Sequence, residues 1–180
     1  MLFRYLCRYY YSVGSNDTNN NKPIENKKAL QTNTENKQIY KGVIASEKTL
    51  PANFHEIAFE RETTPWFQFL VKKVVNPSEF EQTWNLYGFE NKIPNVDFNA
   101  IDIFFIGVSE SGSCPYKIRD VELSSNNHTM TVPLSEPEGA CTSDATPRTF
   151  VIEIDKEIST DIENVVIVKS GVETSIPVEN

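Results

Sequence analysis

Residues 101–108 (IDIFFIGV) constrain the fold most, because they form the most apolar stretch of the part of the chain that can fold. A short apolar run of this kind, without polar alternation, is typical of a strand buried on both faces. We therefore expect this run to be a central strand of a sheet.

Other short segments rich in β-forming residues predict the remaining strands. The expected strands cover residues 39–46 (IYKGVIAS), 56–60 (EIAFE), 66–75 (WFQFLVKKVV), 148–154 (RTFVIEI) and 164–169 (NVVIVK). A hairpin is expected from residues 115–123 (PYKIRDVEL), the turn cluster 124–127 and residues 128–134 (HTMTVPL). The first strand of this hairpin alternates apolar and polar residues, and its register slips once near Arg119-Asp120. In the second strand Met130 and Val132 should point inward.

Between two of these strands the pattern changes to that of a helix. Asn76-Pro77-Ser78-Glu79 combines a capping side chain, a proline at the first helical position and a carboxylate that can reach back. Three aromatic side chains, Phe80, Trp84 and Tyr87, then share one helical face, and Gly88 can end the helix. This aromatic stripe has two interpretations, a ligand platform or core packing, and we expect it to pack on the sheet.

A chain of 180 residues with 39% apolar composition can bury one sizeable core. Because most connections are short, the strands should pair mainly antiparallel. The predicted fold class is mainly β (α+β), with about seven mostly antiparallel strands and one helix packed on the sheet. We expect a single β-rich domain over residues 39–170 and a tail at residues 171–180.

The N-terminal part has a different composition. Residues 14–38 contain only three apolar side chains, too few to offset the entropy of ordering, which predicts a disordered polar tether. Residues 1–13 (MLFRYLCRYYYSV) have the position and charge of an export leader, but Arg4 and Arg8 interrupt the apolar run that a leader needs. We interpret residues 1–13 as an aberrant or degenerate export leader.

The tether is similar to that of a bacterial lipoprotein, in which it follows a lipid-bearing cysteine. Val13 stands where that cysteine would be, and Cys7 lacks the small neighbours of a cleavage site. A misread start is the preferred explanation; a leader that has lost function and a terminus without a targeting role are the alternatives. We expect an extracytoplasmic protein of a bacterial envelope or secretion route, with membrane contact only through a lipid anchor that this sequence lacks.

Cys114 and Cys141 flank the predicted hairpin and lie in loops at the same end of it. A bond between them would close a loop of about 28 residues, worth about 3–4 kcal/mol in the chain-entropy model. Such a bond persists only in an oxidising compartment, and the alternative is two unpaired loop thiols. Because the tether independently suggests export, we expect the disulfide.

Charge and motifs exclude several function classes. The formal charge of −8 argues against a nucleic-acid footprint and against binding to anionic lipid. No CxxC is present and His55 and His128 are isolated, so we expect no metal and no cofactor. The segment 107–111 (GVSES) lacks the closing glycine of a nucleophile elbow, and the carboxylate pairs Glu60/Glu62 and Asp120/Glu122 are typical of solvated strand faces. We therefore expect no catalytic residues.

About half of the chain, roughly residues 66–155, resembles the C-terminal domain of the protease-complex stability subunit (PrcB-type) family of bacterial secreted proteins. The resemblance rests on a helix carrying Trp84 before Pro94-Asn95-Val96-Asp97-Phe98. An apolar strand ending at Gly107, a glycine-bearing loop, an alternating hairpin and a closing strand after Thr146-Pro147 continue it. The resemblance implies a lipoprotein-like protein that binds and stabilises an extracellular protease.

The predicted function is that of a non-catalytic binding module for a protein partner, acting through loops 109–115 and 135–147, since loops on a rigid scaffold commonly carry function. The candidate binding residues are Ser109, Glu110, Ser111, Gly112, Glu136, Glu138 and Asp144. A small envelope protein that binds a ligand or an ion is the alternative. A carboxylate-based hydrolase is a further one.

Overall fold

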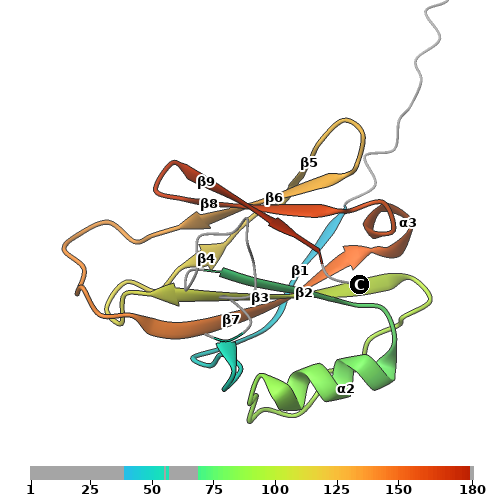
Figure 1. Ribbon diagram of the computed structural model, residues 1–180, viewed down its shortest axis with the longest axis horizontal. Helices are drawn as coiled ribbons and strands as arrows, with labels where there is room; N and C mark the ends of the chain where they lie inside the picture. Colours follow the sequence, from blue (N-terminus) through green and yellow to red (C-terminus); the bar gives the residue numbers. More distant parts are fainter. Residues whose placement is uncertain (1–38, 55, 57–68, 179–180) are drawn as a thin grey trace, which may run out of the picture. The chain divides into compact units, whose positions relative to one another are not determined.

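In a computed structural model, which describes residues 39–54, 56 and 69–178, the strands form two sheets (Figure 1). The first sheet has the order β1-β7-β3-β2 and consists of Tyr40–Glu47, Thr146–Asp155, Ile101–Glu110 and Phe69–Val74. The second sheet contains β4 (Lys117–Ile118), β5 (Glu122–Leu123), β6 (Thr129–Ser135), β8 (Asn164–Lys169) and β9 (Val172–Pro177). The expected leader, tether and Cys7 lie outside the described residues.

The mainly β fold class is confirmed, and the pairing is antiparallel with one exception among the described strands. β6 and β8 pair in parallel, with Met130 opposite Val165. They are parallel because the chain leaves the second sheet after β6, runs through β7 in the first sheet and then returns. Strand β7 therefore ties the two sheets together.

The two sheets pack face to face as a sandwich. The layer between them is built from side chains of both sheets, including Phe104 and Ile152 from the first sheet and Met130, Val132 and Ile167 from the second. All five side chains are fully buried. The expected inward orientation of Met130 and Val132 is confirmed.

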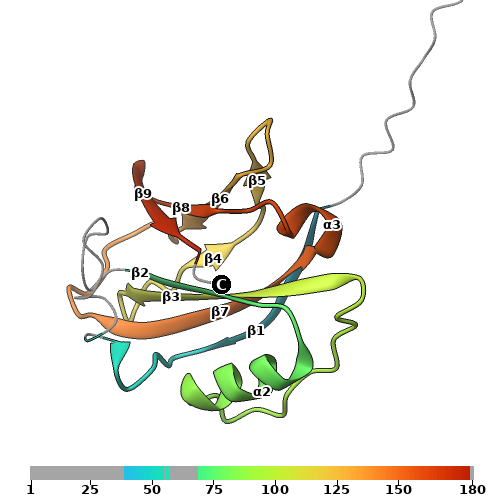
Figure 2. The same cartoon turned by 45° about the vertical axis from the view of Figure 1, so that its right-hand side comes forward.

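Strand β3 lies inside the first sheet and is covered on both faces, as its composition predicts. Phe104 and Ile106 point into the sandwich. Ile103 and Phe105 point to the opposite face, which helix α2 (Pro77–Leu86) covers (Figure 2).

Helix α2 begins and ends where the sequence predicts. The Asn76 side chain accepts a hydrogen bond from the Glu79 N–H at 3.0 Å, and Pro77 occupies the first turn. Gly88, which follows the helix, has a φ of +69°, a conformation that glycine adopts at little cost. Among the described residues, no helix is long and apolar enough to cross a bilayer.

The aromatic stripe of α2 is core packing and not a ligand platform. Phe80, Trp84 and Tyr87 are each at most 3% exposed and contact Phe105 with ring centroids 5.1–6.5 Å apart. The Trp84 indole N–H donates to the Asn91 carbonyl at 3.1 Å, which satisfies the one polar atom of that side chain.

Three expectations need correction. Residues 172–177 form strand β9 and are not a tail, because Thr174 and Ile176 point into the sandwich while β9 pairs with β8. Glu56, expected to begin a strand, is helical, and residues 57–60 lie outside the described residues. The short helix α3 (Lys156–Ser159) follows β7 without a connecting loop, and the sequence had not predicted it.

The first strand of the hairpin splits into β4 and β5, which both pair with β6. The break falls at residues 119–121, where the sequence predicts a slip of register.

A buried polar cluster lies where α3 covers one end of the sandwich. The Lys73 ammonium is 3.6 Å from Asp102 and donates to the Ser159 carbonyl at 2.6 Å, and the Ser159 hydroxyl donates to Asp102. Lys156 also pairs with Asp102 at 3.4 Å. Burial lowers the pKa of Lys73. The Asp102 carboxylate is thus neutralised by two lysines, as a buried charge requires.

Candidate binding site at the disulfide-linked loops

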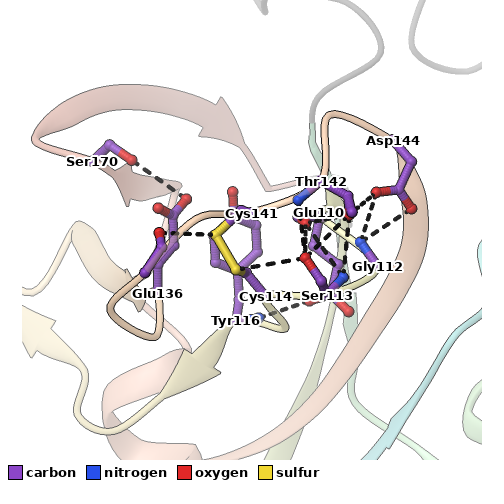
Figure 3. The surroundings of a disulfide bond; sticks show 12 residues. Glu110, Gly112, Ser113, Cys114, Tyr116, Glu136, Cys141, Thr142, Asp144 and Ser170 are labelled. Atoms are coloured by element: carbon purple, nitrogen blue, oxygen red, sulfur yellow. Dashed lines mark hydrogen bonds between the residues drawn. A yellow bond between two sulfur atoms is a disulfide. The ribbon is translucent and has the colours of Figure 1, made fainter.

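Two loops meet at the ends of β3, β4, β6 and β7, which is the end of β3 and β7 remote from α3. They are the β3–β4 loop (residues 111–116) and the β6–β7 loop (residues 136–145). A disulfide joins them through Cys114 and Cys141, with an S–S distance of 2.03 Å and a Cα–Cα distance of 5.6 Å (Figure 3). Cys114 is buried and Cys141 is exposed. The predicted disulfide is confirmed.

Asp144 makes the second link between the loops. Its carboxylate accepts hydrogen bonds from the Gly112 N–H at 3.1 Å, from the Thr146 hydroxyl at 2.8 Å and from the Thr142 hydroxyl. The Thr142 and Thr146 hydroxyls and the Gly112 amide hold the pKa of Asp144 at about 2. Asp144 is therefore a fixed negative charge at neutral pH.

Gly112 is required for this contact. A Cβ at residue 112 would lie 2.5 Å from the Asp144 Oδ2 atom and 3.1 Å from the Thr146 hydroxyl. Only glycine lets the backbone amide approach the carboxylate so closely.

A set of hydroxyl groups makes the third link. The Ser111 and Thr142 hydroxyls are 2.9 Å apart, and the Thr142 N–H donates to the Ser113 hydroxyl at 2.9 Å. These contacts cross between segments about thirty residues apart in the chain, so both loops hold one mutual arrangement.

The structure overturns the assignment of Glu110 to a binding surface. Glu110 is 2% exposed, and it accepts from the Arg148 Nε at 2.8 Å and from the Tyr116 N–H at 2.8 Å. The reason is that Arg148, on the neighbouring strand β7, lies partly buried beside it and needs a negative partner. Glu110 therefore supports the loops from inside the domain.

Glu136 is exposed, but it also anchors a loop. It accepts a hydrogen bond from the Tyr116 hydroxyl and one from the Ser170 hydroxyl at 3.4 Å. Burial and the nearby Glu136 raise the pKa of Tyr116. Figure 3 places Glu136 and Asp144 on either side of the disulfide, so the β6–β7 loop is fastened along its length.

The other predicted residues have different positions. Ser111 and Gly112 lie in the linked network with Asp144, whereas Ser109 is the last but one residue of β3, opposite Pro147. Glu138 is exposed on the β6–β7 loop. The structure thus brings together Ser111, Gly112 and Asp144, and it leaves Glu138 as an exposed acidic side chain beyond them.

An apolar pocket that no sequence pattern predicts lies beside these loops. It has a volume of about 420 Å³ and is lined by Leu50, Pro51, Ala52, Phe54, Ser109, Ala145 and Pro147. Residues 47–55 carry no clear strand or helix pattern. The only local signal is two prolines, Pro51 and Pro147, which restrict the backbone of the segments that line the pocket. A more open hollow is lined by residues of both loops, among them Gly112, Cys141 and Asp144.

The acidic and histidine side chains named in the sequence analysis do not converge on a metal site in the described part of the chain. Within residues 39–54, 56 and 69–178, no three His, Cys, Asp or Glu side chains are grouped so that they could hold a metal ion. Asp120 and Glu122 are exposed, and His128 pairs with Glu163 at 3.2 Å on the surface. His55, Glu60 and Glu62 lie outside the described residues.

Comparison with known proteins finds no matching protein family, no matching curated protein and no matching solved structure. The resemblance to the PrcB-type family stays a prediction from the sequence.

Proposed function

We propose that this protein is a non-catalytic binding module that works outside the cytoplasm and holds another protein at its disulfide-linked loops. The observation that carries the proposal is the triple fastening of the β3–β4 and β6–β7 loops by Cys114–Cys141, by Asp144 and by the hydroxyl contacts. Exposed loops that are held rigid lose little entropy on binding, which favours recognition.

The disulfide supports a location outside the cytoplasm, because such a bond persists where thiols are oxidised. A bacterial envelope or secreted location, with lipoprotein-like attachment, agrees with this and with the polar composition of residues 14–38. A secreted protease is the partner that the sequence resemblance to the PrcB-type family suggests.

The carboxylates at this end of the domain favour binding over hydrolysis. Glu110 pairs with Arg148, and Asp144 accepts hydrogen bonds from three donors that hold its pKa at about 2. A general acid needs a pKa near the working pH, so Asp144 is poorly suited to that role.

Site-specific photo-crosslinking tests the proposal. A photoreactive amino acid at Glu138, on the loop, should crosslink to a protein partner in the native host, and the same residue at Glu122 provides the control. Glu122 is equally acidic and exposed but lies on β5, which pairs with the first half of β6, away from the linked loops. Equal crosslinking at both positions, or none at Glu138, would contradict the proposal.

A second variant makes the test specific. In Cys114→Ser/Cys141→Ser protein the crosslink at Glu138 should weaken, because the loops are no longer fastened. The partner identified by mass spectrometry should then bind the purified wild-type domain.

The apolar pocket favours a second candidate, the binding of a small apolar ligand, since such sites are commonly clefts of about 300–1,000 Å³. Native mass spectrometry of the purified protein distinguishes the two functions. A stoichiometric small molecule that survives purification would support the second candidate.

A further inference from the structure

We infer that the protein partner inserts an apolar side chain into the pocket at residues 50–54 and 145–147, and places a lysine or arginine beside the acidic β6–β7 loop. This inference rests on the proposed function, and it adds the chemistry by which the partner is recognised.

Hydrogen bonds hold the wall of the pocket that residues 50–54 form. The Thr149 hydroxyl, on β7, donates to the Thr49 carbonyl at 2.6 Å, and the Thr49 hydroxyl donates to the Tyr87 carbonyl at the end of α2 at 2.5 Å. Phe54 is 4% exposed and its N–H donates to the Pro51 carbonyl at 2.9 Å. This wall is thus held by both the first sheet and the helix.

The floor depends on a glycine. A Cβ at Gly107 would lie 2.5 Å from the Leu50 Cδ2 atom, so Leu50 packs directly on the backbone of β3. The opposite wall is formed by Ser109 and Pro147, which face each other in the β3–β7 register. The pocket is therefore preformed, and little rearrangement is needed to fill it.

The charge around the pocket indicates the sign of the charge that the partner carries there. The β6–β7 loop, which ends at Ala145 in the pocket wall, contains Glu136, Glu138 and Asp144 and no Lys, Arg or His. Arg148, the nearest cation along the chain, is neutralised by Glu110. Lys48 lines a separate hollow with Arg148 and Glu90. Lys169 lies over the Tyr116 ring, whose hydroxyl binds Glu136, and Asp144 is held by three donors. The exposed Glu138 is therefore the carboxylate that a cationic group on the partner meets.

An apolar anchor beside a cation uses both features, whereas a small apolar molecule would use only the pocket. Buried anchors in a preformed pocket contribute most of the affinity of many interfaces, and charges at the rim select the partner and speed association. We therefore expect a linear segment that carries Leu, Ile, Met or Phe within a few residues of Lys or Arg.

The probe is a displayed library of random linear peptides, selected on the purified, oxidised full chain. Enriched peptides should share an apolar residue next to Lys or Arg. Their affinity should fall about ten-fold or more in Ala145→Trp, which fills the pocket, and should stay unchanged in Ser175→Trp, a matched exposed position on β9 of the second sheet.

Two charge-reversal variants test the predicted contact between a cationic group of the partner and the β6–β7 loop. Glu138→Lys should weaken the selected peptides and reduce the dependence of their affinity on salt, whereas Glu122→Lys, with the same change of net charge, should do neither. If Ala145→Trp does not fold, Ala52→Trp, which blocks the exposed rim of the pocket without changing its charge, takes its place.

The inference is overturned if the selected peptides lack the apolar and basic pair, or if they bind Ala145→Trp as tightly as the wild type. It is also overturned if the pocket holds a co-purified lipid or mediates a dimer of this chain in sedimentation analysis. If the photo-crosslink at Glu138 persists while Ala145→Trp binds the identified partner normally, the proposed function stands and the pocket inference alone fails.

Discussion

The Nε atom of Arg148 lies 2.8 Å from the Oε1 atom of Glu110, at the point where β7 leaves the β6–β7 loop and β3 enters the β3–β4 loop. The second oxygen of Glu110 accepts the Tyr116 N–H. One buried carboxylate therefore organises the bases of both loops.

Replacing Glu110 with alanine should destabilise the domain by about 3 kcal/mol, because it leaves Arg148 without its buried partner. Glu110→Gln should cost less, since the amide oxygen can still accept from Tyr116. Denaturant unfolding measures both, with Glu122→Ala as an exposed control that should change the free energy of unfolding by less than about 0.5 kcal/mol. Equal stability of Glu110→Ala and Glu122→Ala would contradict this role.

Removing the disulfide in Cys114→Ser/Cys141→Ser should lower the free energy of unfolding by about 3–4 kcal/mol, from the loop-closure entropy of the unfolded chain. Chemical denaturation of the oxidised wild type and of the double variant gives the difference. In the wild type, alkylation without reduction should leave both cysteines unmodified. Full alkylation of Cys114 and Cys141 in protein from an oxidising compartment would exclude the bond.

The free energy of unfolding should depend on the ionisation of Asp144 at acidic pH. The folded state lowers its pKa from 3.8 to about 2, so the ionised group stabilises the fold above pH 3.8, and this contribution is lost as the pH falls toward about 2. The stability difference between wild type and Asp144→Asn should therefore shrink over that interval.

Nuclear magnetic resonance gives a direct measurement of the same group. The carboxyl carbon of Asp144 and the Gly112 amide, which donates to it, should titrate together with a midpoint of about 2. Gly112→Ala should move the Asp144 midpoint up toward 3.8, because a Cβ displaces the carboxylate. An unchanged midpoint would argue against the close approach of Gly112 and Asp144.

Truncating the helix face should test its packing on the first sheet. Trp84→Ala should cost about 3–5 kcal/mol, since the indole is 1% exposed and its removal leaves a cavity beside Phe105. Leu86→Ala, on the same helix but 53% exposed, should cost little. Thermal unfolding of the two variants, side by side, separates packing from helix propensity, and similar losses would contradict the assignment.

The elements that the sequence predicts well are those specified by local patterns. Helix α2 has its cap, its proline and its aromatic spacing within one segment, and β3 is apolar from Ile103 to Val108. The cysteines could be paired because the hairpin between them is itself a local unit.

The elements that were missed depend on distant partners. Strand β9 uses Thr174 as one of its two inward side chains, so its alternation is weak, and only its pairing with β8 reveals it. Likewise, nothing near Glu110 in the sequence predicts its ion pair with Arg148, which lies 38 positions later. The apolar pocket joins residues 50–54 to residues 145–147, a juxtaposition that the β1–β7 pairing and the Thr149 hydrogen bond create.

The register of β1 on β7 has a mechanical consequence. Tyr40 pairs with Ile154 and Glu47 with Thr149, so the chain enters the domain at the end opposite to the linked loops, about 25 Å away along the strand. A load applied between the loops and the chain before Tyr40 acts along these antiparallel strands. The β1–β7 hydrogen bonds, perpendicular to that direction, then share the force and are not broken one by one. Under such a load β1 slides along β7 and does not peel away from it.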